Sequence, residues 1–169
     1  AAGFMADKGL SKRDEALMEV LASAAATIIE PGVRLRRTEE EILARLEPVI
    51  LGGGPLVVVQ PIVALATGRR IGAEALSRFP LEWNKAPDVV FEEAARVGLG
   101  VDLELLALHG AARHLDHISG YVAMNVSPCT ATDERCLTFF DDLPVDRILL
   151  ELSEHDPVED YERLAAALA

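Results

Sequence analysis

The sequence has little cysteine and no long uninterrupted apolar run. Its two cysteines, Cys129 and Cys136, are seven residues apart, a spacing that matches neither a zinc motif nor a disulfide framework. Reduced, structural thiols are therefore expected, as in a cytoplasmic protein. We see no apolar stretch of about 18 residues and expect no transmembrane helix. The start lacks an initiator Met and the pattern of a signal peptide, which is typical of a piece cut from a longer chain.

Positive charge is also scarce. The formal net charge at pH 7 is -12, and the longest basic run is RLRR at residues 34–37. A chain with this charge repels nucleic acid polymers and anionic membranes. An anionic substrate would therefore need metal ions or a few well-placed arginines. The glycine run LGGGP at residues 51–55 lacks the lysine of a phosphate-binding loop, and no Ser, His and Asp set indicates a catalytic triad.

The first 51 residues have a helical pattern. Apolar residues recur at spacings of three and four over residues 11–30, which predicts a helix that ends at Pro31-Gly32. Thr38 is the expected cap of a second helix that runs to about residue 50. We interpret residues 1–51 as a helical linker or signalling segment and residues 52–169 as a separate domain.

From residue 56 onward the pattern is that of an α/β protein. Residues 56–65 are almost continuously apolar, which predicts a strand buried on both faces. A short turn leads into a second strand over 70–79, so these two strands form a hairpin. The later alternation of strands and helices predicts a parallel sheet with crossover helices. These later elements are helices over 87–100 and 101–118, a strand over 120–128, a helix over 130–143, a strand over 146–155 and a helix over 156–169.

Three polar residues, Glu74, Asn125 and Glu151, lie at or near the carboxyl ends of predicted strands. In open α/β sheets and in barrels, catalytic groups gather at this end of the strands. Three oxygen ligands converging there would suit Mg²⁺ or Mn²⁺. Arg78 follows Glu74 on the same strand face and could bind a phosphate.

Structural roles remain open for the same residues. A strand-end Glu74 beside Arg78 is more often a salt bridge than part of a metal site. A buried Asn125 after a strand more often satisfies loop amides. The sequence ELSE at residues 151–154 more often starts a helix, with Ser153 as its N-cap.

The order of motifs resembles one protein family, the EAL domain of cyclic di-GMP phosphodiesterases. The segment VVVQPIVALATGRRIGAEALSRFP, at residues 57–80, contains the Gln-Pro-Ile, the ATGR turn and the Glu-Ala-Leu that names the family. The helical segment 87–115, YVAMNVSP at 121–128 and ILLELSE at 148–154 follow in the family's order. The resemblance covers about Leu56 to Ala169.

This resemblance implies a fold, a reaction and a set of site residues. The fold is a (β/α)8 TIM-like barrel whose first strand is antiparallel, in agreement with the predicted hairpin. The reaction is hydrolysis of cyclic di-GMP to the linear dinucleotide, with two Mg²⁺ or Mn²⁺ ions activating water. The matching positions are Glu74, Asn125 and Glu151 as metal ligands, Glu154 as an acidic residue that supports the site, Arg78 as a phosphate ligand, and Gln60 and Leu76 in the nucleotide pocket; Glu74 and Glu154 are the expected catalytic residues.

The resemblance also indicates what is missing. A (β/α)8 barrel takes about 250 residues, so residues 52–169 are expected to form a partial barrel, its N-terminal half. The family's Asp-Asp pair, Lys and further acidic ligand would follow ELSE and are not found. Asp141-Asp142 precedes ELSE and is expected at a helix end instead. The chain alone is expected to be inactive, with the barrel completed by further sequence, by a second chain or in a homodimer.

Two readings of function follow for a cytoplasmic bacterial signalling protein. The first is a metal-dependent cyclic di-GMP phosphodiesterase. The alternative is a non-catalytic EAL-type module that binds cyclic di-GMP or a protein partner. The start of the chain, residues 3–30, resembles the last strand and helix of a GAF-type sensor domain, in which case residues 11–50 would relay a signal through a helical dimer.

Overall fold

The computed structural model describes residues 11–153 and 161–167. The chain divides into two compact units, residues 1–41 and 42–169. The helix α1 (Lys12–Leu51) begins in the first unit and supplies the first residues of the second. The GAF-type strand predicted near the start falls outside the described residues, and that resemblance stays a prediction.

The helix α1 is continuous over 40 residues, so the break predicted at Pro31-Gly32 is wrong. Proline removes one backbone donor but does not end a helix whose neighbouring turns hold it. An ion pair between Glu30 and Arg34 spans this point. Thr38 is not a cap, because its hydroxyl donates to the carbonyl of Arg34 four residues earlier (3.0 Å).

Hydrogen bonds between Ser11 and Asp14 cap the beginning of α1. The Ser11 hydroxyl accepts from the backbone N–H of Asp14 (3.3 Å), and the Asp14 carboxylate accepts from the backbone N–H of Ser11 (3.1 Å). The Ser11 hydroxyl also donates to the Asp14 carboxylate (2.6 Å), and this hydrogen bond, followed by the one from the Ser11 backbone N–H, lowers the pKa of Asp14. Two orphan backbone donors are thus satisfied reciprocally at the helix start.

The expectation that no apolar span occurs needs correction. One 18-residue window of α1 has a mean hydropathy of 1.4 and at most two charged residues, which is long and apolar enough to cross a membrane by length and composition. Residues 16–33 meet this description, with Glu19 and Glu30 as their only charges. Helices of soluble proteins can pass the same test, so it does not by itself identify a membrane span.

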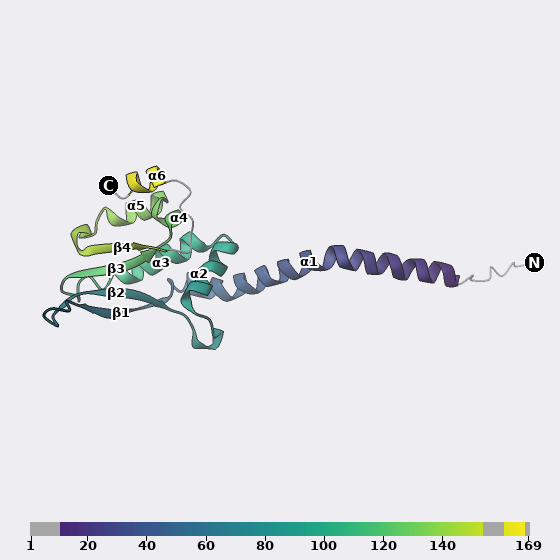
Figure 1. Ribbon diagram of the computed structural model, residues 1–169, viewed down its shortest axis with the longest axis horizontal. Coiled ribbons are helices and arrows are strands. Elements are labelled where there is room, and N and C mark those ends of the chain that lie inside the picture. The colour runs from purple at the N-terminus through teal and green to yellow at the C-terminus, as the bar shows by residue number, and fades with distance from the viewer. Residues whose placement is uncertain (1–10, 154–160, 168–169) are drawn as a thin grey trace, which may run out of the picture. The chain divides into compact units, whose positions relative to one another are not determined.

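The second unit is an α/β domain built on one four-stranded sheet (Figure 1). The strands lie in chain order, with β1 antiparallel to β2, and with β2, β3 and β4 parallel. This arrangement confirms the predicted hairpin and the mixed α/β fold. The strands are β1 (Leu56–Val63), β2 (Arg70–Arg78), β3 (Tyr121–Val126) and β4 (Ile148–Leu152); the helices are α2 (Pro87–Arg96), α3 (Gly100–Ala112), α4 (Pro128–Ala131), α5 (Glu134–Phe140) and α6 (Tyr161–Ala167), with the 3-10 turns η1 (Leu81–Trp83) and η2 (Val145–Arg147).

The strand β1 is not buried on both faces as its apolar sequence predicted. It lies at one end of the strand order, and its residues are exposed or half-buried throughout. Leu56 is 68% exposed and Val63 47%. A continuous apolar run does not distinguish an edge strand from a central one, because the sequence pattern depends on the strand's own side chains and not on which strands pair with it.

One face of the sheet carries the main core. Alternate residues of β2 and β3, among them Ala73, Ala75, Val122 and Met124, pack against the buried side of α3. Figure 1 shows α3 crossing this sheet. The other face of the same strands is thereby left to the polar residues described below.

A second, smaller core joins the end of α1 to α2. Ile42 and Leu46 of α1 are almost fully buried and pack with Val90, Ala94 and Leu103. The compact unit therefore begins at residue 42, ten residues before the boundary expected after residue 51. The predicted signalling role of residues 1–51 stays a prediction.

Trp83 belongs to this second core. Its ring stacks on Phe79 with centroids 5.7 Å apart, and the Arg45 guanidinium lies 5.5 Å from its centroid. Trp83 therefore covers the second core.

Candidate active site

The register of the sheet brings the predicted metal ligands onto neighbouring strands. Glu74 of β2 is paired with Ala123 of β3, and Asn125 of β3 is paired with Glu151 of β4. Because side chains alternate along a strand, Glu74, Asn125 and Glu151 share the face opposite the main core. Asn125 and Glu151 are exposed there, and Glu74 is half-buried.

Glu74 and Asn125 also touch. The Asn125 amide donates to the Glu74 carboxylate at 3.5 Å, a long hydrogen bond. In the described part of the chain no ion pair joins Glu74 to Arg78, whose guanidinium donates to the carbonyl of Ser77 (2.9 Å). The structure therefore does not contain the salt bridge that was the alternative for Glu74 and Arg78. Arg78 is exposed, and its charge remains available to an anion.

The three predicted ligand-binding residues lie on this same face. Gln60 of β1 is directly opposite Glu74, and Leu76 and Arg78 follow Glu74 at intervals of two. Gln60 is exposed and Leu76 half-buried. The face thus presents carboxylates, amides and one guanidinium around an apolar side chain, a mixture suited to a polar, anionic ligand.

The oxygen donors of this face fit a hard divalent cation. Two carboxylates and one carboxamide are ligands of the type that Mg²⁺ and Mn²⁺ prefer. Among the described residues, no three His, Cys, Asp or Glu side chains lie close enough to form a metal site by themselves. Glu154, the fourth predicted acidic residue, lies outside the described residues.

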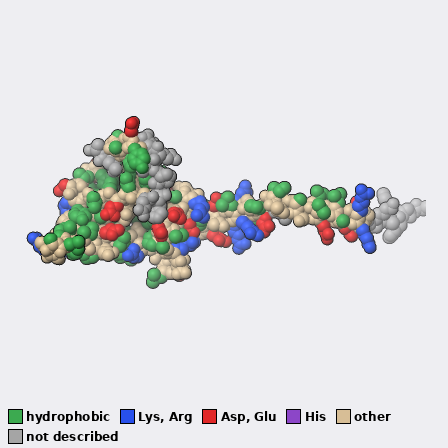
Figure 2. Space-filling model, viewed as in Figure 1, with side chains coloured by type: hydrophobic (Ala, Val, Ile, Leu, Met, Phe, Trp, Pro, Cys, Tyr) green, Lys and Arg blue, Asp and Glu red, His purple; other side chains and the backbone are tan. Residues whose placement is uncertain are grey.

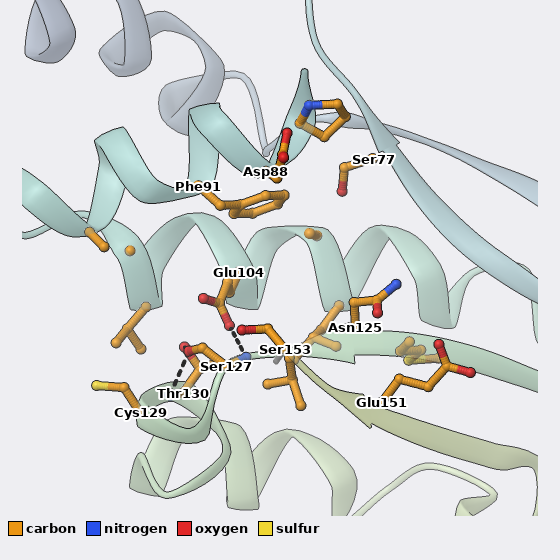
Figure 3. Close-up of a pocket in the computed structure, with 18 of the residues that line it drawn as sticks. Ser77, Asp88, Phe91, Glu104, Asn125, Ser127, Cys129, Thr130, Glu151 and Ser153 are labelled. Atoms are coloured by element: carbon orange, nitrogen blue, oxygen red, sulfur yellow. Dashed lines mark hydrogen bonds between the residues drawn. The ribbon is translucent and has the colours of Figure 1, made fainter. Parts of the chain in front are cut away.

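A cavity of about 1260 Å³ opens at the carboxyl ends of β2, β3 and β4. Leu76, Arg78, Asn125 and Glu151 line it from the sheet. Figure 3 shows Asp88 and Phe91 of α2 across the cavity from Asn125 and Glu151, with Glu104 of α3 beside Ser127. Sheet, helices and loops therefore enclose one space beside the predicted ligands.

Sequence reasoning missed Glu104. Its carboxylate accepts a hydrogen bond from the backbone N–H of Ser127 (2.8 Å), just after Asn125 (Figure 3). The Ser127 hydroxyl caps α4 by accepting from the backbone N–H of Thr130 (3.2 Å). Glu104 thus holds the turn that follows β3, two residues after Asn125. In the sequence, the one signal for Glu104 is a carboxylate placed between two leucines, Leu103 and Leu105. The structure shows that both leucines are buried.

An ion-pair cluster lies at the rim of the cavity. Arg135 contacts both Asp102 (2.6 Å) and Asp133 (3.0 Å). The hydrogen bonds from Arg135 lower the pKa of Asp133, which caps α5. The predicted single helix over 130–143 is therefore two short helices, because Ser127 and Asp133 each begin one. Asp141 and Asp142 lie at the end of α5, as expected, and not at the strand ends.

The two cysteines are predicted to differ sharply in reactivity. Cys129 is exposed and lines the cavity, whereas Cys136 is buried. Burial, with smaller effects of Glu104 and Asp133, raises the pKa of Cys136 to about 11. At pH 8 we expect a thiol reagent to label one cysteine quickly and the second only after denaturation. Cys129→Ser should abolish the fast phase, and a fast phase that persists in this variant would contradict the assignment.

Comparison with known proteins identifies the class to which this fold and site belong. The family model of the EAL domain matches residues 44–169. The chain therefore belongs to the EAL domain family, as its Glu74-Ala75-Leu76 motif indicated.

Curated relatives and solved structures agree with this assignment. The uncharacterized protein Rv1357c of Mycobacterium tuberculosis is 35% identical over 113 residues, which are 58% of this chain and 37% of that protein. The probable cyclic di-GMP phosphodiesterase PdeB of Escherichia coli is 28% identical over 138 residues, 73% of this chain and 27% of that protein. The chain thus spans well under half the length of these relatives.

Solved EAL domains have the same fold. The FimX EAL domain of Xanthomonas citri, in complex with c-diGMP, matches with a TM-score of 0.61 and 16% identity over 80% of this chain and 58% of that one. The EAL enzyme Bd1971, in a form with cAMP and cyclic-di-GMP bound, matches with a TM-score of 0.54 and 19% identity over 94% of this chain and 47% of that one. The mixed sheet with an antiparallel first strand is thus part of an EAL-type architecture.

Proposed function

We propose that this chain carries the first part of the EAL domain of a cytoplasmic phosphodiesterase that hydrolyses cyclic di-GMP to the linear dinucleotide. The observation that carries the proposal is the alignment of Glu74, Asn125 and Glu151 on one sheet face, beside an open cavity. The relationship to a probable phosphodiesterase supports the same reaction. The remainder of the site would come from residues beyond this chain or from another chain.

Each residue of the face would have a separate task. Glu74, Asn125 and Glu151 would hold divalent metal, and Arg78 would bind a phosphate oxygen that faces it. Gln60 and Leu76 would contact the nucleotide, and Glu154 would support the ligands. Glu104 would keep Asn125 in place through the turn at Ser127. When bound, Mg²⁺ or Mn²⁺ would supply charge neutralisation and the activation of water.

A non-catalytic binding module is the second candidate. The FimX EAL domain was solved with c-diGMP bound, and the exposed Arg78 could hold a phosphate without hydrolysis. The two candidates differ in whether metal-dependent turnover occurs.

The first test is cyclic di-GMP hydrolysis on a sample whose intact mass is measured, because 18.2 kDa is the mass of this chain alone. In a longer form that completes the barrel, we expect turnover with Mg²⁺ or Mn²⁺ and none with EDTA. Glu74→Gln keeps the shape of the side chain but removes its charge, and should lower turnover by about a hundredfold.

Glu82→Gln is the matched control, because Glu82 is exposed and does not line the cavity. It should leave turnover unchanged. Turnover that survives both EDTA and Glu74→Gln would reject the metal-dependent site. Tight binding of cyclic di-GMP without turnover, in a sample with the complete domain, would establish the second candidate instead.

A further inference from the structure

A row of four side chains connects the end of α1 to the wall of the cavity. Phe91 of α2 lines the cavity, where Figure 3 shows it beside Asp88, and it also packs in the second core. Its ring meets the Phe79 ring edge to face, with centroids 5.6 Å apart. Phe79 stacks on Trp83, and the Arg45 guanidinium lies over the Trp83 ring. We call these four side chains the Arg45–Phe91 row.

Only one end of the Arg45–Phe91 row borders the cavity. The described residues that line it include Phe91 and Arg78, and they do not include Phe79, Trp83 or Arg45. Phe79 directly follows Arg78, and successive side chains of a strand point to opposite faces. Arg78 therefore faces the cavity, and Phe79 packs in the second core. A ligand in the cavity can touch Phe91 and Arg78, and the rest of the row lies behind them.

The loop that carries Trp83 is attached to the domain by Trp83 itself. In Figure 2 the segment between β2 and α2 projects from the domain and has a hydrophobic side chain at its surface. Leu81, in the same turn η1 as Trp83, is 94% exposed, whereas Trp83 is half-buried. The packing of Trp83 on Phe79 therefore holds this loop against the domain.

Ion pairs fix the row to its surroundings. The Glu93 carboxylate binds Arg45 of α1 and Lys85 of the loop before α2. Glu93 lies on α2, the helix that also carries Phe91. These contacts therefore join the helix at the cavity wall to α1 and to the loop of Trp83.

We propose that Phe79, Trp83 and Arg45 are positioning residues of the candidate site, which fix the Phe91 ring at the cavity wall and thereby set the affinity of the cavity for its ligand. Side chains packed at interior density transmit strain, because one ring cannot shift without moving its neighbours. The positioning of Phe91 does not depend on the proposed function, whereas the effect on affinity rests on cyclic di-GMP as the ligand.

The coupling between the cavity and the row must act in both directions. A ligand that favours one position of Phe91 also favours the packing behind that ring, because linked equilibria are reciprocal. Trp83 is the only tryptophan of the chain, and it lies behind the wall and not in the lining. Ligand binding should therefore change the fluorescence of Trp83 without contacting it.

The first test needs no ligand. Para-fluorophenylalanine in place of Phe91 gives a fluorine NMR resonance that depends on the surroundings of the ring. Arg45→Gln removes the cation over Trp83 and should shift or broaden this resonance. Arg45→Lys keeps a cation for Trp83 and Glu93 and should largely restore it.

Arg36→Gln is the matched control, because Arg36 is an exposed arginine of the same helix. It should leave the resonance of the labelled ring unchanged. An identical resonance in Arg45→Gln and in the unaltered protein would overturn the positioning role.

The second test measures affinity in a longer form that completes the barrel, with Glu74→Gln to slow turnover. Phe79→Leu keeps an apolar side chain but removes the ring, and it should weaken the binding of cyclic di-GMP in calorimetry by about three- to tenfold. Leu81→Ala, at the exposed residue of η1, should leave affinity unchanged. A merely structural role of Phe79 would lower the unfolding midpoint and leave the affinity of the folded protein unaltered. Equal affinities of the two variants would overturn the effect on binding.

Fluorescence distinguishes this inference from the proposed function. The emission of Trp83 should change with the same half-saturation as calorimetry, and Phe79→Leu should remove this change. Binding in calorimetry without any change in emission would overturn the coupling and leave the proposed ligand in place. Absence of binding both with and without Glu74→Gln would reject cyclic di-GMP and the effect on its affinity, while a fluorine resonance that shifts in Arg45→Gln would still establish the positioning of Phe91.

Discussion

Replacing Glu93 with alanine is expected to lower the free energy of unfolding by about 1–3 kcal/mol, because it leaves two half-buried cations without their partner. The Glu93 side chain is 12% exposed and binds two cations, Arg45 of α1 and Lys85 of the loop before α2. Lys85 donates to Glu93 at 2.8 Å, and Arg45 binds the other carboxylate oxygen. One carboxylate therefore joins three segments of the second core.

Arg45 makes this position especially sensitive. Its Nε is the one buried side-chain nitrogen or oxygen without a hydrogen-bond partner among the described residues. Loss of Glu93 would remove the carboxylate that pairs with this half-buried guanidinium, and an unpaired charge that is partly shielded from water costs more than a fully exposed one. Trp83, over which Arg45 lies, is the only tryptophan of the chain and reports on this cluster by fluorescence.

The neighbouring residue is a matched control. Glu92 is exposed, and Glu92→Ala should change stability by no more than about 0.5 kcal/mol. Urea denaturation followed by fluorescence and circular dichroism should show the lower midpoint for Glu93→Ala with an unchanged slope. Equal midpoints for the two variants would mean that the buried ion pair does not stabilise the core.

Gly120→Ala should be at least as damaging, with a loss of about 3–5 kcal/mol from backbone strain and a steric clash together. Gly120 has φ +96°, and a Cβ there would lie 2.0 Å from the carbonyl oxygen of Ile71. The contact is with the backbone of β2, so no side chain can move aside. The pairing of β2 with β3 begins next to this point, at Gly72 and Tyr121.

The control separates strain from the clash. Gly68 also has a positive φ, +66°, but a Cβ there would meet nothing within 4 Å. Gly68→Ala should cost only about 1–2 kcal/mol, the usual price of a left-handed conformation. Thermal denaturation of the two variants measures the difference. Similar losses in both would show that the close approach of β2 and β3 is not required.

The same approach of β2 and β3 assembles the candidate site. Glu74 and Asn125 are 51 residues apart in the chain, yet their side chains are in hydrogen-bond contact. Neither residue has a fixed place relative to the other until the two strands pair. A substitution at Gly120 therefore tests the scaffold of the site without altering any proposed ligand.

Much of this protein is determined by its sequence alone. Turn residues and alternating apolar patterns located the hairpin and the parallel strands, because these signals are local in the chain. The motifs around Glu74, Asn125 and Glu151 identified the EAL family for the same reason. The capping pair at Ser11 and Asp14 was also predictable, since both partners lie within one turn.

Only the tertiary structure decided the rest. Neighbours far away in sequence decide which strand lies at an edge of the sheet. They also decide which apolar residues of α1 join the domain core and which carboxylate binds the backbone of Ser127. Pro31-Gly32 was expected to end a helix, because local signals do not register the turns that hold it on both sides. Periodicity states which residues can share a face; the pairing of distant segments determines what that face meets.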